Sequence, residues 1–324
     1  MHSPRFFQEL IEEEIKKIVL SNNPPELYDP IRYMLTLGGK RMRPAALLMS
    51  NELCGGNPFS ITGPALGIEM FHNFTLLHDD IMDKAPLRRA QPTVHTRWNP
   101  DIAILSGDTM FVQSCQHMMQ VEDKYLREVL ELFHKTAIEV CEGQQLDMNF
   151  ESRNDVSIPE YINMIALKTA VLLGASLHIG ALLSGTTAEN ARLLYNFGKD
   201  LGIAFQLHDD ILDVYADAGK FGKQVGGDII ANKKTFLLLT ALELADSINK
   251  AELNRWLSLK DFDPVEKVAA VKRIYESLNV RQRAEQEMEK FYLSAMRSFD
   301  LVDADKEKKN VLRQWALQLM QRES

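Results

Sequence analysis

The chain contains few of the residues that interrupt or cross-link a fold. Its 324 residues include only 3 cysteines, 17 glycines and 12 prolines. Three cysteines cannot form a disulfide framework, and their spacing matches no zinc site, so we expect reduced thiols. Because glycine and proline mark turns, their scarcity predicts few turns and long helices.

An excess of positive charge and long apolar runs are also missing. The chain has 37 Lys and Arg against 45 Asp and Glu, whereas a nucleic-acid binder normally carries a basic footprint. We therefore expect no nucleic-acid partner. No run reaches about 18 consecutive apolar residues, so no membrane span is expected. The first residues carry acids throughout and resemble neither a secretion signal nor a transit peptide, which favours a cytoplasmic protein.

Apolar residues recur at helical spacing along almost the whole sequence, as at Phe6, Leu10 and Ile11. This periodicity predicts an all-α protein that forms one domain over residues 1–324. The expected helices cover 4–20, 25–36, 41–54, 62–83, 101–122, 125–149, 159–184, 187–215, 233–246, 249–258, 264–298 and 303–321. Two charged breaks, 84–100 and 217–232, are long enough to indicate functional loops.

A short acidic motif occurs twice, each time after a long apolar helical stretch. LHDDIMD at 77–83 and LHDDILD at 207–213 match at six of seven positions. The aspartates are Asp79, Asp80 and Asp83 in the first copy and Asp209, Asp210 and Asp213 in the second. Each set crowds its carboxylates on one helix face, near the C-terminal end, where the helix dipole already disfavours anions.

A single acidic helix end could simply be solvated, but two matching copies point to a divalent cation. Oxygen-only ligands without His or Cys suit Mg²⁺, which usually binds one or two carboxylates together with substrate phosphates. The basic residues that suggest a polyanion are Lys40, Arg41, Arg43, Arg88, Arg89, Lys168, Lys220, Lys223, Lys233 and Lys234. Each alone could be ordinary surface charge; together they suggest clamps for diphosphate.

These motifs resemble those of the trans-isoprenyl diphosphate synthases, the polyprenyl synthetase family. The resemblance spans roughly residues 38–236 and implies an isoprenoid-synthase helical bundle around a deep central cavity, a homodimer, and three Mg²⁺ ions. It also implies head-to-tail (1′-4) condensation of isopentenyl diphosphate with an allylic diphosphate. The apolar helices below the aspartates would then hold the prenyl chain, and bound metal would stabilise the leaving diphosphate as a Lewis acid.

The resemblance also implies a role for individual residues. Asp79, Asp83 and Asp209 would coordinate Mg²⁺ directly, and Asp80, Asp210 and Asp213 would support them. Isopentenyl diphosphate would be bound by Gly39, Lys40, Arg43, His72 and Arg89. The allylic diphosphate would be bound by Arg88, Lys168, Thr169, Gln206, Lys223 and Lys233. Two positions depart from the common pattern: Ala90 replaces a glycine after the paired arginines, and Ala231-Asn232 replace Glu-Gly before Lys233.

Product length depends on the residues below the first motif. Phe74 lies five residues before Asp79, about 7.5 Å down the helix at about 1.5 Å per residue. Thr75 and Phe71 are the other residues that could set the cavity depth. The Phe-Thr pair and the lack of an insertion in the motif resemble archaeal-type geranylgeranyl diphosphate synthases, so we expect a C20 product, with C15 or C25 as alternatives.

Three other protein classes share part of this pattern. A class I terpene cyclase also has an aspartate-rich helix, but its second metal site usually mixes Asn, Ser or Thr with Glu, and it has no need of the Lys40 and Arg43 pair. A di-iron bundle requires Glu-x-x-His pairs on facing helices, and none stands out. A non-catalytic regulatory subunit typically lacks one aspartate motif, and this chain has both.

Overall fold

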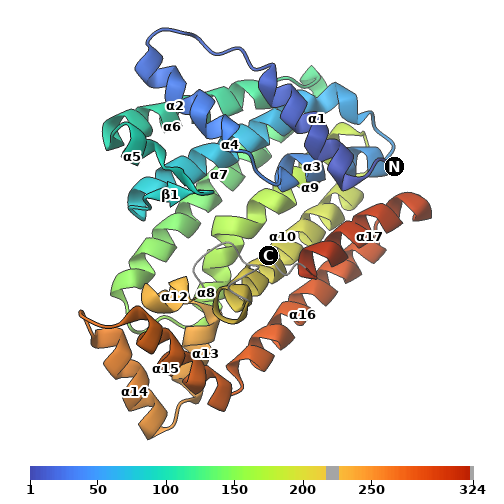
Figure 1. Ribbon diagram of the computed structural model, residues 1–324. Helices are drawn as coiled ribbons and strands as arrows, with labels where there is room; N and C mark the ends of the chain where they lie inside the picture. The colour runs from blue at the N-terminus through green and yellow to red at the C-terminus, as the bar shows by residue number, and fades with distance from the viewer. Residues whose placement is uncertain (217–225, 322–324) are drawn as a thin grey trace. The chain divides into compact units, whose positions relative to one another are not determined.

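The computed structural model describes residues 1–216 and 226–321, and these residues are almost entirely helical (Figure 1). The longer helices are α1 (Pro4–Lys16), α2 (Pro25–Thr36), α3 (Met42–Leu53), α4 (Thr62–Met82), α6 (Pro100–Met118), α7 (Asp123–Ser152), α8 (Ile158–Ile165), α9 (Val171–Leu183), α10 (Ala188–Tyr215), α13 (Phe236–Leu244), α14 (Ser247–Ser258), α15 (Pro264–Ser277), α16 (Val280–Asp300) and α17 (Lys306–Met320). The predicted all-α fold is confirmed.

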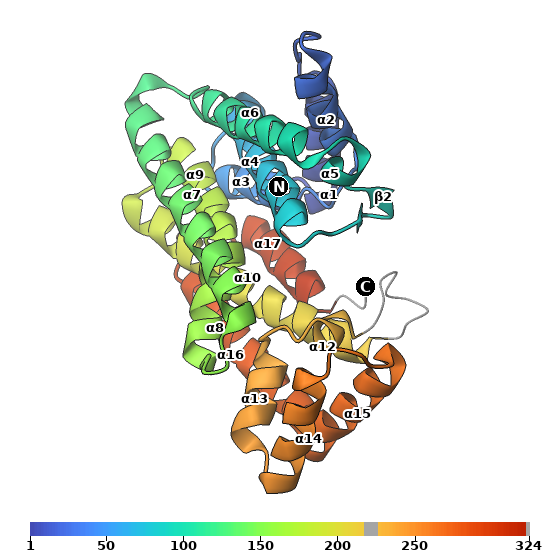
Figure 2. The ribbon, with the colours of Figure 1, turned by 90° about the vertical axis from the view of Figure 1, so that its left-hand side faces the viewer.

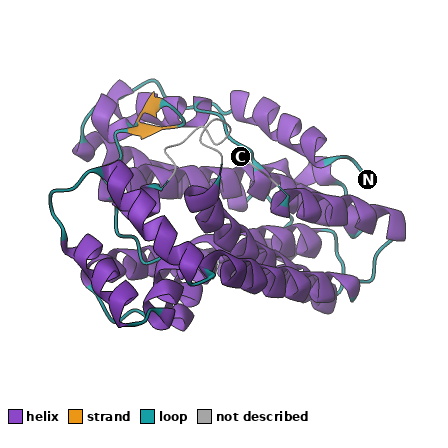
Figure 3. Ribbon diagram, turned by 60° about the horizontal axis from the view of Figure 1, so that its bottom comes forward, coloured by secondary structure: helices purple, strands orange, loops and turns teal. Residues whose placement is uncertain are grey.

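The remaining elements are short. They are the 3₁₀ helix η1 (Pro58–Ile61), the helical turns α5 (Val94–Arg97) and α12 (Gly227–Ile230), and the π-helical turn η2 (Ala166–Ala170), which joins α8 to α9. Among the described residues, the strands β1 (Leu87–Arg88) and β2 (Gln91–Pro92) form the only sheet, an antiparallel pair drawn in orange in Figure 3.

The chain divides into two compact units. Unit 1 comprises Met1–Thr136, Ala175–Tyr195 and Val302–Leu312, and unit 2 comprises Ala137–Gly174, Asn196–Leu301 and Arg313–Ser324. In unit 1, α4 packs along α6 and also contacts α1, α2 and α3. In unit 2, α13, α14 and α15 lie beside one another in both Figure 1 and Figure 2. The single domain expected from the sequence stays a prediction.

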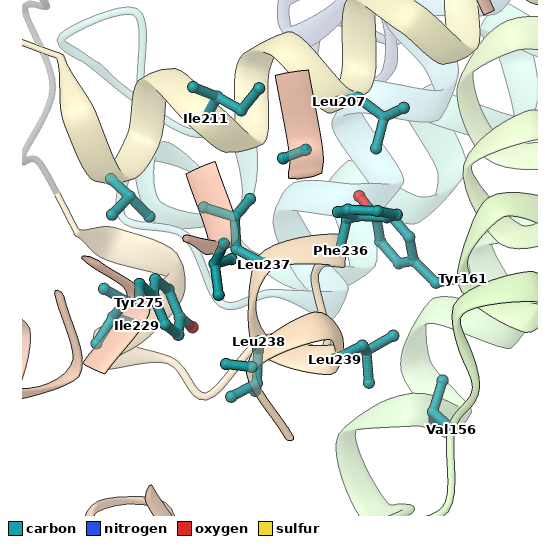
Figure 4. Packing of buried hydrophobic residues seen from close by; sticks show 14 of the residues in the cluster. Val156, Tyr161, Leu207, Ile211, Ile229, Phe236, Leu237, Leu238, Leu239 and Tyr275 are labelled. Carbon is teal, nitrogen blue, oxygen red and sulfur yellow. The ribbon is translucent and has the colours of Figure 1, made fainter. Parts of the chain in front are cut away.

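The core of unit 2 gathers apolar side chains from α8, α10, α12, α13 and α15. Figure 4 shows Phe236 and Leu237 of α13 between Tyr161 of α8 and Ile211 of α10. Each fully buried Leu or Phe side chain stabilises the fold by about 1.5–3 kcal/mol. This packing therefore holds α10, the helix that carries the second acidic motif, against its neighbours.

Several predicted elements differ in the structure: the helix expected over 159–184 is α8, η2 and α9, and the break expected over 217–232 contains α12. The helix expected over 264–298 is two helices, α15 and α16, because Asn279 adopts a left-handed backbone with φ 53° and ends the continuous hydrogen-bond ladder. The break expected over 84–100 contains regular structure, namely the β1–β2 hairpin and α5.

One segment, Ile158–Leu183, is long and apolar enough to cross a membrane by length and composition alone. Counting consecutive apolar residues overlooked it because polar residues such as Lys168 and Thr169 interrupt the run. In the structure 78% of its most apolar window is buried inside the protein, as in a core helix.

The start of α8 is fixed by a capping box. Ser157 Oγ accepts a hydrogen bond from the Glu160 backbone N–H, and Glu160 Oε2 accepts one from the Ser157 N–H at 2.9 Å. Arg153 donates to the other oxygen of Glu160 at 2.8 Å. The Ser157 N–H, followed by Arg153, lowers the pKa of Glu160 from 4.5 to about 2.

This lowered pKa predicts how pH changes stability. A carboxylate whose folded pKa is depressed stabilises the fold above its unfolded pKa, and the contribution is lost as pH falls toward the folded pKa. Glu160→Gln should therefore lower the free energy of unfolding at pH 7, and the deficit should shrink between pH 4.5 and pH 2. Urea unfolding at several pH values measures this difference in the free energy of unfolding, with the exposed Glu128→Gln as control. A difference that does not change with pH would contradict the lowered pKa of Glu160.

Candidate active site

The predicted site residues form two groups. The group around the first acidic motif belongs to unit 1, and the group around the second motif belongs to unit 2. In unit 1 the first acidic motif forms the last turn of α4, whose C-cap residue is Asp83. Asp80 is only 2% exposed. Arg88 Nε donates to both carboxylate oxygens of Asp80, at 2.9 and 2.8 Å. Burial raises the pKa of Asp80, and the bond from Arg88 opposes that rise. Asp79 is partly exposed, 3.6 Å from the same guanidinium, and Asp83 is exposed.

The two arginines of the isopentenyl and allylic sites sit at the β1–β2 hairpin. Its two central residues, Arg89 and Ala90, have φ values of 53° and 61°, which is the pattern of a type I′ turn. Ala90, the first departure from the family pattern, thus occupies a conformation that glycine adopts without strain. The turn forms with alanine in place of the glycine that the family commonly has at position 90. Arg88 and Arg89 occupy adjacent positions at this turn.

The loop before α3 brings together residues predicted to bind isopentenyl diphosphate. The Arg89 guanidinium donates to the Gly38 carbonyl and lies so close to Gly39 that a Cβ there would be 3.0 Å from it. Arg43 donates to Nε2 of His72 on α4 at 3.2 Å. Burial, with the neighbouring arginines, lowers the pKa of His72 well below its usual range, so the imidazole is neutral and can accept that bond. Lys40 is exposed in the same loop.

Arg41, which the sequence grouped with these basic residues, has a different role. Its side chain is fully buried, with Nε 2.7 Å from Glu12 of α1 and an NH group 2.5 Å from Glu69 of α4. A third bond reaches the Leu35 carbonyl at 3.0 Å. Arg41 is therefore a structural tie between three helices, and the expectation that it clamps diphosphate was wrong.

The three residues expected to set chain length lie in α4 below the first motif. Phe71 is fully buried against Phe111 of α6 and Phe133 of α7, at 6.0 and 5.4 Å between ring centroids. Phe74 contacts Phe111 at 5.3 Å. Thr75 uses its hydroxyl to bond the His72 carbonyl of its own helix at 2.8 Å. The two phenylalanines thus form one aromatic cluster within a turn of each other.

In unit 2 the second motif lies near the C-terminal end of α10. Asp210 is 4% exposed; it accepts a hydrogen bond from the Tyr161 hydroxyl of α8 and one from Gln206 Nε2 at 3.2 Å. Burial and the nearby Asp228 raise the pKa of Asp210 well above its usual range. Asp213 caps α12, accepting from the Asp228 backbone N–H at 3.0 Å, and Asp209 is partly exposed.

Beside Asp210 lies a cavity of about 100 Å³. Four predicted allylic-site residues line it: Lys168, Thr169, Gln206 and Lys233. Lys168 projects from the π-helical turn η2, a type of distortion frequent at functional sites, and its Nζ lies 2.6 Å from Asp147. Lys220 and Lys223, from the same set of basic residues, lie outside the described residues.

Two residues of this half were missed by the sequence reasoning. Tyr161 is a core residue of α8 that the sequence does not distinguish from any other aromatic. Asp228 lines the cavity and raises the pKa of Asp210; its place beside two glycines in the second charged break was the one available signal.

The donor set suits a hard divalent cation. Asp79, Asp83, Asp209 and Asp213 carry exposed or partly exposed carboxylates, which provide only oxygen ligands, as Mg²⁺ prefers. Across residues 1–216 and 226–321, no group of three or more His, Cys, Asp or Glu residues could hold a metal ion alone.

Comparisons with known proteins agree with this chemistry. The polyprenyl synthetase family model matches residues 24–278. A geranylgeranyl diphosphate synthase of Methanosarcina mazei is 41% identical over 72% of each chain, and a geranylfarnesyl diphosphate synthase of Natronomonas pharaonis is 38% identical over 72% of this chain and 74% of its own. A crystal structure of geranylgeranyl pyrophosphate synthase superposes with a TM-score of 0.95 at 41% identity, covering all of both chains.

Fold and site together define an all-α enzyme of prenyl diphosphate chemistry. The chain belongs to the polyprenyl synthetase family and is a trans-isoprenyl diphosphate synthase, a prenyltransferase of isoprenoid biosynthesis. Members of this family are generally Mg²⁺-dependent and act on isoprenoid diphosphates. The family and the enzyme class expected from the sequence are thereby confirmed, whereas the roles of single residues stay predictions.

The contrast between Arg41 and Arg43 gives a test. Arg41→Met leaves Glu69 buried without its cation, which typically costs about 3–5 kcal/mol. Arg43 is partly buried beside neutral His72, and desolvation lowers its pKa, so Arg43→Met should cost little stability and should instead raise the KM for isopentenyl diphosphate. Urea unfolding and steady-state kinetics separate the two effects. Equal destabilisation by both variants would contradict the division of roles.

Proposed function

We propose that the protein condenses isopentenyl diphosphate with an allylic diphosphate, head to tail (1′-4), to give an all-trans C20 product. The repeated acidic motif at the ends of α4 and α10 carries this proposal. Relatives that share about 40% identity support the C20 length, since two of them are named geranylgeranyl diphosphate synthase. Product lengths of C15 and C25 are the alternatives.

In this proposal Asp79, Asp83 and Asp209 would hold three Mg²⁺ ions, which would supply Lewis-acid stabilisation of the charge on the leaving diphosphate. Arg88, Lys168, Thr169, Gln206, Lys223 and Lys233 orient the allylic diphosphate. Gly39, Lys40, Arg43, neutral His72 and Arg89 hold isopentenyl diphosphate. Asp80, Asp210 and Asp213 act as supports, because Asp80 and Asp210 are buried and hydrogen-bonded and Asp213 caps α12.

We also propose a cytoplasmic homodimer. Leu105 and Val112 of α6 and its C-cap residue Met119 are each more than half exposed and are spaced seven residues apart. A helix face of this kind is typical of a surface that packs against another chain. The three cysteines Cys54, Cys115 and Cys141 are free, which suits a reducing compartment.

The direct test of the function is chromatography of products made from labelled isopentenyl diphosphate, Mg²⁺ and a panel of allylic primers. The wild type should give a C20 prenyl diphosphate. Asp79→Asn and Asp209→Asn should each lower turnover by about 10²–10³, because they remove charge stabilisation at the leaving group. The exposed Asp101→Asn serves as control. Hydrocarbon formed from farnesyl diphosphate alone would instead indicate a terpene cyclase.

Phe74 should limit product length. Phe74→Ala removes the ring that lies about 7.5 Å below Asp79, so the cavity deepens and products longer than C20 should accumulate. The same assay measures this effect, with Phe59→Ala, an exposed phenylalanine elsewhere in unit 1, as the matched control. An unchanged product spectrum would refute Phe74 as the floor.

A further inference from the structure

Lys233 follows a turn whose backbone is unusual. After α12 the chain turns at Ala231 and Asn232, and Asn232 adopts a left-handed conformation with φ 55°. The Lys233 N–H then bonds the Asp228 carbonyl at 3.0 Å. The direction in which Lys233 leaves the backbone is therefore set by this turn. Asn232 is also the position where the family pattern commonly has glycine, which adopts such a conformation more readily.

A fully buried lysine holds the turn from the neighbouring helix. Lys267 of α15 is 0% exposed, and its Nζ donates to Oδ1 of Asn232 at 2.6 Å and to the Ile230 carbonyl at 3.2 Å. The same Nζ lies 4.2 Å from the centre of the Phe262 ring. Lysine is almost never fully buried unless its charge is satisfied. Here both hydrogen-bond acceptors belong to the segment that precedes Lys233.

Asn232 extends this contact to a second helix. Its Nδ2 donates to the Leu257 carbonyl in the last turn of α14 at 3.1 Å. One carboxamide therefore connects the turn to α14 and, through Lys267, to α15. A glycine at this position could make neither bond, so the departure from the family pattern adds an anchor for the turn.

We infer that Lys267 and Asn232 are positioning residues that fix the turn before Lys233 and thereby set how tightly the allylic diphosphate is bound. This inference rests on the proposed function, in which Lys233 contacts that diphosphate. Misplacement of a positioning group by about 1 Å can cost up to about a hundredfold in rate. The effect should be confined to the allylic substrate, because the predicted isopentenyl residues belong to unit 1.

The experiment compares Lys267→Met, Asn232→Gly and the double variant with the wild type. Lys267→Met keeps an apolar chain of similar length, and Asn232→Gly keeps the backbone conformation while removing the anchor. Each single variant should weaken binding of farnesyl thiodiphosphate, an unreactive allylic analogue, by about tenfold in calorimetry with Mg²⁺. The double variant should lose less affinity than the sum of the two single losses, since both substitutions remove the bond between Lys267 and Asn232.

Kinetics and two further variants distinguish positioning from loss of folding. The KM for the allylic substrate should rise about tenfold, while the KM for isopentenyl diphosphate stays within about twofold. Asn232→Asp, which keeps the acceptor for Lys267, should restore most of the affinity lost in Asn232→Gly. The exposed Lys260→Met should behave as wild type.

Two results would overturn the inference: unchanged analogue binding in both single variants, or an equal rise of both KM values. If the wild type binds the analogue but forms no product, the proposed condensation fails, and the ratio of affinities still decides the role of Lys267. If the wild type does not bind the analogue, both proposals fail.

Discussion

Mutual repulsion among carboxylates at two helix ends is the constraint on which the site depends. Both acidic motifs lie near the C-terminal end of a helix, where the dipole adds to the repulsion. The protein relieves part of it internally: Arg88 holds Asp80, and Tyr161 and Gln206 hold Asp210. Asp79, Asp83 and Asp209, which are predicted to coordinate metal, are partly or fully exposed, whereas Asp80 and Asp210 are buried.

The basic residues look alike in the sequence, but they differ in the structure in their burial and in the groups that they contact. Arg41 has two carboxylate partners and no exposed surface, so it belongs to the framework. Arg43 lies two residues further on, pairs with a neutral imidazole and has no equivalent ion pair among the described contacts. Lys168 and Lys233 line a cavity beside the second motif. Burial and ion pairing therefore set Arg41 apart from the residues that are predicted to bind diphosphate.

The sequence predicted most helices because apolar spacing survives wherever a helix packs on a core. It could not place the break between α15 and α16, because neither Leu278 nor Asn279 is a glycine or a proline. The residue with the left-handed backbone is an asparagine. The aspartate motifs were readable because they are local and repeated. Tyr161 and Lys267 were not, because each acts through a contact between residues at least 35 positions apart.

The proposed function requires both acidic motifs to bind metal around one diphosphate. Anomalous diffraction from crystals grown with Mn²⁺ in place of Mg²⁺ and with an unreactive allylic diphosphate analogue tests it most directly. We expect manganese at Asp79, Asp83 and Asp209 together with one bound diphosphate. Manganese at only one motif, or a diphosphate bound away from both, would contradict it.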